Sequence, residues 1–110
     1  MLRNSSAVTN YFGYWPEFCD ARVESISFSR PGTVELTLFY IDTEQNKSSY
    51  VTFRFHGVAD LELSELRNDN VVDELVIEPG QTMTVQIVSA CGLSGRFTCL
   101  DAEVRDVKNT

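Results

Sequence analysis

Regular alternation of apolar and polar residues most constrains the fold of this chain. Residues 50–57 and 81–90 alternate in this way. The clearest case is residues 33–41, where every second position is apolar: Val34, Leu36, Leu38 and Tyr40. A period of two residues turns one face of a strand toward a core and the other toward solvent. The pattern is typical of antiparallel sheets and not of a doubly wound parallel sheet, whose strands are apolar on both faces.

Turn-forming residues divide the chain into about seven expected strands. These cover residues 21–30, 33–41, 50–57, 58–64, 71–78, 81–90 and 96–108. The polar stretch 42–49 is expected as a loop, 64–70 as a loop or a single helical turn, and 92–95 as a hairpin loop. We therefore expect one mostly β domain over residues 1–110, with α+β as the alternative. The strands would form two layers, or one strongly curled sheet covered by an N-terminal helix.

Two of the expected strands change phase within their length. Ala21 and Val23 are apolar at odd positions, whereas Ile26 and Phe28 are apolar at even positions. A β-bulge near residues 24–25 would reconcile these two halves. Residues 96–108 change phase as well, with one apolar set followed by another: first Phe97 and Cys99, then Leu100, Ala102 and Val104.

Residues 11–21 carry five of the twelve aromatic residues and the only tryptophan. A short helix over residues 4–12 is expected before them, capped by Ser5 or Ser6 and ended by Gly13. Because buried rings stabilise a core strongly, this stretch is expected to be an aromatic plug that fills the interior. Its structural residues are expected to be Trp15, Pro16, Phe18, Cys19 and Asp20. Pro16 is expected to start a short turn, Cys19 to be buried, and the Asp20 carboxylate to accept backbone N–H groups.

The net charge of −7 argues against nucleic acid or an anionic membrane as a partner, because both need a basic surface. No apolar run is long enough to span a membrane, and the first residues lack the apolar core of a secretory signal. Three cysteines in no metal-ligand spacing favour a reducing, cytoplasmic compartment. We expect no cofactor and no metal. Cys91 and Cys99 flank the expected hairpin but suit no disulfide with a four- or five-residue loop, so both are predicted as small core residues.

A catalytic centre is not indicated by the remaining residues. A nucleophilic cysteine needs a base, and the only histidine, His56, falls on the polar face of its expected strand. Nothing in the spacing brings it to Cys19. Paired carboxylates in a pocket beside Trp15 remain a less favoured enzyme hypothesis.

Acidic residues gather in residues 60–78, which hold seven acids and one arginine and so carry −6 of the net −7. Such a field could speed association with a basic partner. It could equally protect a sheet edge against aggregation. The expected partner-binding residues are Asp60, Glu62, Glu65, Asp69, Asp73 and Glu74.

The run 12–23 resembles the opening signature of the immunity protein 50 family of bacterial polymorphic toxin systems. That signature reads Trp-Pro-x-Phe-His-Asp-Ala-x-Val, and the matching residues here are Trp15, Pro16, Phe18, Asp20, Ala21 and Val23. Residues 51–61 are similar to a strand leading into Phe-x-Gly-Val-x-Asp-Leu, and residues 92–100 are compatible with the family. Cys19 stands where the family usually has histidine, which favours a structural role for the motif.

The resemblance implies a small cytoplasmic protein, encoded beside a toxin, that binds the toxin and blocks it without turnover. The acidic segment would fit a basic, nuclease-like toxin. The alternatives are a β-rich structural or interaction module with another partner, or the small carboxylate-based enzyme. The oligomeric state does not follow from the sequence.

Overall fold

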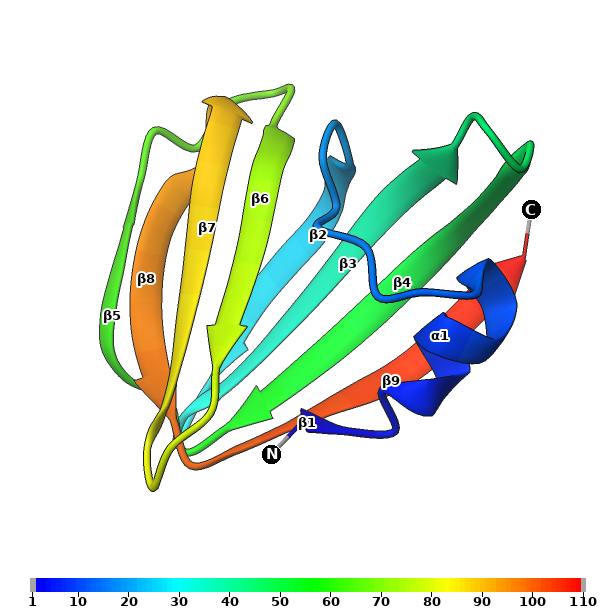
Figure 1. Cartoon of the computed structure of the whole chain (residues 1–110). Helices are drawn as coiled ribbons and strands as arrows, with labels where there is room; N and C mark the ends of the chain where they lie inside the picture. The colour runs from blue at the N-terminus through cyan, green and yellow to red at the C-terminus, as the bar shows by residue number, and fades with distance from the viewer. Residues whose placement is uncertain (1, 110) are drawn as a thin grey trace.

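The computed structural model describes residues 2–109, which form one nine-stranded sheet and one short helix (Figure 1). The mostly β prediction is therefore confirmed. The strand order is β1-β9-β4-β3-β2-β6-β7-β8-β5. Among residues 2–109, no helix has the length and apolar character needed to cross a membrane. In chain order, the elements are β1 (Leu2–Arg3), α1 (Ser6–Phe12), β2 (Arg22–Ser29), β3 (Thr33–Asp42), β4 (Lys47–His56), β5 (Ala59–Ser64), β6 (Val71–Glu78), β7 (Met83–Cys91), β8 (Ser94–Cys99) and β9 (Asp101–Asn109).

The sheet folds over where β2 meets β6. These two strands share a single register pair, Arg22 with Val71, whereas β3 and β4 pair along their full lengths. We call β1, β9, β4, β3 and β2 the terminal half, and β6, β7, β8 and β5 the central half. The halves face each other in Figure 1, and the ring centroids of Phe55 on β4 and Phe97 on β8 lie 5.1 Å apart. One curled sheet thus encloses the core between its own two halves.

Alternation along β3 and β4 correctly predicted which side chains face this core. Every second residue of β4 is buried from Ser49 to Phe55, and the residues between them are partly exposed. In β3, Val34, Leu36 and Leu38 are buried, and Tyr40 is half-buried. The expected loop over residues 42–49 is shorter than predicted, because β4 already begins at Lys47. Ser49 is buried in β4 despite its polarity, since its hydroxyl donates to the Lys108 carbonyl on β9 at 3.1 Å. Because the Ser49 hydroxyl has a hydrogen-bond partner on the neighbouring strand, this polar residue can be buried within β4.

Both phase changes have structural causes. The register between β2 and β3 shifts between Val23 and Ser25, so the predicted bulge is confirmed. The predicted single strand over residues 96–108 is wrong, because β8 pairs with β7 in the central half and β9 pairs with β4 in the terminal half. The chain crosses between the halves at Leu100, which is 69% exposed and not on the expected apolar face. Its backbone N–H donates to the carbonyl of His56 at 2.9 Å.

The predicted antiparallel pairing across this hairpin is confirmed by β7 and β8, but the predicted loop bounds of 92–95 are wrong. β8 begins at Ser94, and Ile87 pairs with Gly95, a register that neither expected loop length allows. This register places Cys99 in the core opposite Met83, whereas Cys91 is exposed at the end of β7. The prediction of a core position therefore holds for Cys99 and fails for Cys91. All three cysteines are free thiols.

The N-terminal helix and the aromatic plug are present. Gly13 ends α1 with a left-handed φ of 87°, and its N–H donates to the Thr9 carbonyl. Phe18 is fully buried, with its ring centroid 5.6 Å from that of Phe53 and 5.4 Å from that of Tyr40. Trp15 is only partly buried at the edge of this ring cluster.

Candidate functional site

The motif segment, residues 13–21, runs between α1 and β2 as irregular chain. Pro16 is buried, and no turn begins at this residue, so the turn expected there is wrong. Leu75 N–H donates to the Glu17 carbonyl at 3.0 Å, and Asp20 N–H donates to the Val72 carbonyl at 2.8 Å. The turn of this segment lies later, at residues 18–21, where Ala21 N–H donates to the Phe18 carbonyl at 3.0 Å. The bonds with β6 fix the motif against the central half of the sheet.

Left-handed backbone at Phe18 and Asp20, with φ of 64° and 66°, directs successive side chains to opposite sides. Phe18 enters the core, and Cys19 is exposed, which corrects the expectation that Cys19 is buried. Among residues 2–109, the Asp20 carboxylate accepts none of the expected backbone hydrogen bonds. Aspartate contributes here through its tolerance of the left-handed region. The side chain of Asp20 is thereby left at the surface.

The Cys19 thiol is not activated by its surroundings. The negative charge of Asp20 is the largest cause that raises the pKa of Cys19, followed by desolvation and by the charges of Asp73 and Glu17. His56 lies at the far end of β4, opposite Asp101. The structure therefore does not bring the cysteine and the histidine together, and the thiol stays protonated near neutral pH.

A hydrogen-bonded network orders the surface beside Cys19. The Tyr14 hydroxyl donates to the Asp42 carboxylate at 2.8 Å and lies 2.9 Å from the Tyr40 hydroxyl. The same carboxylate accepts the backbone N–H groups of Glu44 and Gln45. Hydrogen bonds from Gln45 and then Tyr14 lower the pKa of Asp42, and desolvation followed by the bonds to Tyr40 and Asp42 raises the pKa of Tyr14.

A hollow of about 570 Å³ opens at this network. We call it the motif hollow. Tyr14 and Ile41 present exposed apolar surface to it, with 41% and 51% of their areas accessible. Its lining residues are Tyr14, Cys19, Asp20, Tyr40, Ile41, Asp42, Thr43 and Glu44.

The six predicted contact residues do not form one continuous face. Asp60 and Glu62 lie on β5 at the sheet edge, and Asp73 and Glu74 lie on β6. β7 and β8 separate these two strands, although the strands follow each other in sequence. The structure divides the six residues between two surfaces.

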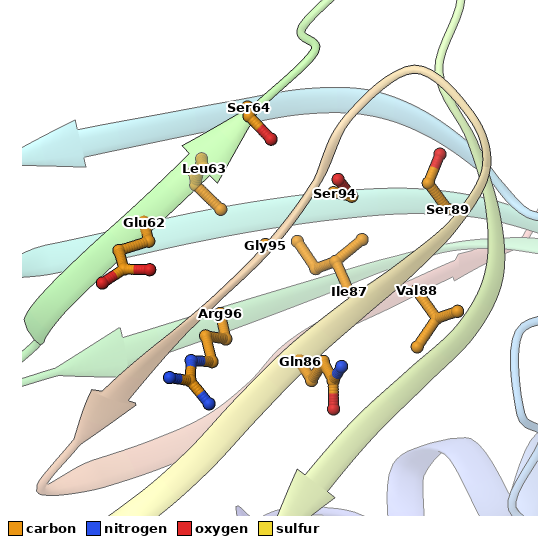
Figure 2. A pocket seen from close by; sticks show the side chains of 10 residues that line it. All are labelled: Glu62, Leu63, Ser64, Gln86, Ile87, Val88, Ser89, Ser94, Gly95 and Arg96. Atoms are coloured by element: carbon orange, nitrogen blue, oxygen red, sulfur yellow. The ribbon is translucent and has the colours of Figure 1, made fainter.

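The first surface is a hollow of about 800 Å³ on the outer side of the central half, which we call the outer hollow. Figure 2 shows Glu62 on β5 beside Arg96 on β8, its partner in register. Among residues 2–109, Arg96 forms no ion pair within 4.0 Å. Asp60 lines an adjoining hollow of about 360 Å³ that shares Glu62 and Arg96. The outer hollow is lined by Glu62, Leu63, Ser64, Gln86, Ile87, Val88, Ser89, Ser94, Gly95 and Arg96.

Glu74 belongs to the same outer surface. It pairs in register with Val88, a residue of the outer hollow, and register partners share a face. Three strand spacings separate β6 from β5, and Glu74 is level with Ser64, two residues from Glu62, so Glu74 and Glu62 lie about 16 Å apart across the hollow. Asp60, Glu62 and Glu74 are therefore the predicted contact residues of this surface.

The second surface is the end of the molecule that contains the motif hollow. The β5–β6 connection, the segment entering β2 and the β3–β4 turn all lie at this end, along the top of Figure 1. Glu65 and Asp69 lie in the first of these connections, and Asp73 is close enough to Cys19 to raise its pKa. We call this surface the acidic end and define it by its carboxylates: Glu17, Asp20, Asp42, Glu44, Glu65, Asp69 and Asp73. Glu17 and Glu44 are not among the contact residues predicted from the sequence, because both lie outside residues 60–78.

A fourth hollow, of about 310 Å³, lies beside Trp15. Its described lining residues are Leu2, Ser5, Trp15, Ile77, Pro79 and Met83. None of these is a carboxylate. The hypothesis of an enzyme beside Trp15 therefore finds no acid–base pair among the described residues at that place.

The fold and these surfaces define a small β-sheet protein with two accessible acidic regions and a free sheet edge. Residues 4–110 match the family model described as Immunity protein 50. The chain belongs to the immunity protein 50 family, as the motif resemblance indicated. A search of curated proteins found no match, and a search of solved structures found none. The family name implies a non-enzymatic role with a toxin as the partner.

Proposed function

We propose that this chain is a bacterial immunity protein that binds a cognate toxin in the cytoplasm and blocks it without turnover. The observation that carries the proposal is the family match over residues 4–110. A rigid β structure with surface hollows suits inhibition by contact, because a bound partner can be covered without any chemical step. The immunity protein then acts by steric and electrostatic occlusion.

Charge supports a basic toxin, such as a nuclease. A nuclease surface that holds phosphates must be basic, and this chain has a net charge of −7. The proposed contact residues remain Asp60, Glu62, Glu65, Asp69, Asp73 and Glu74, now divided between the outer hollow and the acidic end. Complementary fields of this kind raise association rates by roughly 10- to 10³-fold at low salt.

Protection of the sheet edge is a second role that one observation favours for part of this charge. β5 lies at the free edge of the sheet, beyond β8. It carries Asp60 and Glu62, and its pairing with β8 is interrupted between Ala59 and Glu62. Charge and irregular backbone on an edge strand both oppose pairing with another molecule.

Co-expression with the product of the neighbouring gene tests the proposal. We expect the two proteins to purify together and the chain to restore growth of cells that express the toxin. The triple variant Glu62→Lys, Asp73→Lys and Glu74→Lys should slow association and flatten its dependence on salt, as stopped-flow kinetics would show. A control triple variant reverses three acids of β2 and β9, on the terminal half of the sheet: Glu24, Glu103 and Asp106.

The outcomes separate the two parts of the proposal. Absence of binding and of growth rescue would refute the immunity function. Binding with an unchanged association rate in the first triple variant would refute the acidic contact surface and leave the immunity function intact. Equal slowing by both triple variants would show that net charge, and not these positions, sets the rate.

A further inference from the structure

The motif hollow has an exposed aromatic and aliphatic wall that the fold holds in place. Tyr14 is fixed by its hydrogen bond to Asp42, and the Tyr40 ring packs against Phe12 at 5.3 Å and against Phe18 at 5.4 Å between centroids. Ile41 stands at the mouth with half of its area exposed. The apolar surface of the hollow is therefore preorganised and uncovered in the described chain.

The polar lining of this hollow carries one sign of charge. Asp20, Asp42 and Glu44 line it, and no lysine or arginine is among its described lining residues. Glu17 and Asp73 add negative charge close to Cys19. An anionic or purely apolar occupant would be disfavoured by this field, whereas a cation with an apolar stem is complementary to the whole surface.

We infer that the motif hollow accepts an arginine side chain of the partner protein. The arginine stem would lie against Ile41, and its planar guanidinium would stack on the Tyr14 and Tyr40 rings. Asp20 and Glu44 would receive the guanidinium N–H groups. Lysine shares the charge but lacks the planar surface for stacking. This inference rests on the proposed function and names the part of the toxin that the acidic end recognises.

The location of the hollow links this role to the family motif. Residues 15–18 hold the segment in the core, and the left-handed backbone at Asp20 leaves the carboxylate of this residue at the surface. The motif thus builds one wall of the hollow, while the β3–β4 turn builds the other. The structure gives the motif a binding role in addition to its packing role.

Binding of the neighbouring gene's product to matched variants tests the inference. The double variant Ile41→Ser and Glu44→Lys removes apolar surface and reverses one charge at the hollow. The control, Leu100→Ser and Glu78→Lys, makes the same exchanges at exposed positions at the opposite end. We expect the first variant to bind about tenfold more weakly by biolayer interferometry, and the control to bind within about twofold of the parent. Thermal unfolding of each variant verifies that both remain folded.

A small probe tests the hollow independently of the toxin. N-acetyl-arginine amide is titrated into the labelled parent chain, and NMR shifts of the Ile41 methyl and Tyr14 ring groups are followed. The neutral isostere N-acetyl-citrulline amide is the control. We expect saturable shifts at these residues with the arginine probe alone, and loss of the Tyr14 ring shift in the Ile41→Ser, Glu44→Lys variant.

Each outcome is decisive. Unchanged toxin affinity in that variant, or equal shifts with arginine and citrulline, would overturn the arginine site even if the toxin binds elsewhere. Failure of the parent chain to bind the toxin would refute the proposed function, and the probe titration would still decide whether the hollow accepts arginine. If the double variant unfolds, the single Glu44→Lys variant with Glu78→Lys as control takes its place.

Discussion

Replacement of Asn70 by alanine should destabilise the fold through three hydrogen bonds made by one buried amide. Asn70 is 7% exposed in the connection between β5 and β6. Its Oδ1 accepts the backbone N–H groups of Arg67 at 3.0 Å and Leu93 at 2.8 Å. Its Nδ2 donates to the Arg67 carbonyl at 2.7 Å. The side chain thus ties the β5–β6 connection to the β7–β8 turn.

The magnitude follows from which partners water can reach. Leu93 is buried, so its N–H would lose its acceptor without replacement, at about 1–3 kcal/mol. Arg67 is exposed, so water can take over its two bonds at little cost. We expect a total loss of about 2–3 kcal/mol in the free energy of unfolding, and a fall in Tm of roughly 10 °C for a domain of this size.

Urea unfolding followed by circular dichroism measures this loss. Asn68→Ala is the matched control, because Asn68 lies in the same connection and is exposed. Asn70→Asp keeps the acceptor for Leu93 and loses the donor to Arg67, so it should fall between the parent and Asn70→Ala. A loss below about 0.5 kcal/mol for Asn70→Ala, or an equal loss for Asn68→Ala, would refute the reasoning.

Three further predictions test other parts of the structure. Phe18→Ala should lower the free energy of unfolding by about 3–5 kcal/mol, and Trp15→Ala by less because Trp15 is partly exposed; equal losses in urea titrations would contradict this difference. The lowered pKa of Asp42 means that its carboxylate stabilises the fold above the unfolded pKa of about 3.9, and that this contribution is lost as pH falls through the lower folded pKa. Asp42→Asn should therefore flatten the acid limb of a stability–pH profile, and an unaltered limb would count against the network. Gly95→Ala should destabilise the fold by more than about 2 kcal/mol, because Gly95 has φ 149° and an added Cβ would overlap the carbonyl oxygen of Glu62; full stability in thermal melts would disprove that close approach.

Side-chain alternation reports directly on which face of a strand is buried, and this is why the strands β3, β4 and β7 could be predicted. It carries no information on which strands are neighbours. The phase change after Cys99 was visible in the sequence, but a bulge and a crossing between halves of the sheet give the same local signal. Likewise, the residues around Ser49 do not indicate that its hydroxyl donates a hydrogen bond to β9 and that Ser49 therefore belongs to a strand.

The candidate site was predicted only in part, for a related reason. The motif at residues 15–20 and the acidic residues of the β5–β6 region were visible because each is local. The separation of Glu62 from Asp73 could not be predicted, because it arises from β7 and β8, which lie between β5 and β6 in the sheet. The meeting of Asp20 with Glu44 depends on the β3–β4 turn reaching the motif segment, which only the assembled fold provides.

The central half is one uninterrupted stretch of chain, residues 59–99, and its two ends return to the same place. The N–H of Leu100 bonds to the carbonyl of His56 there, and β2 and β6 share only one register pair elsewhere. Recombination with breakpoints near residues 57 and 100 would therefore exchange β5 to β8 as a cassette. Such an exchange would replace the outer hollow in a single genetic event and keep every residue of the motif hollow, so the two hollows can diversify at different rates.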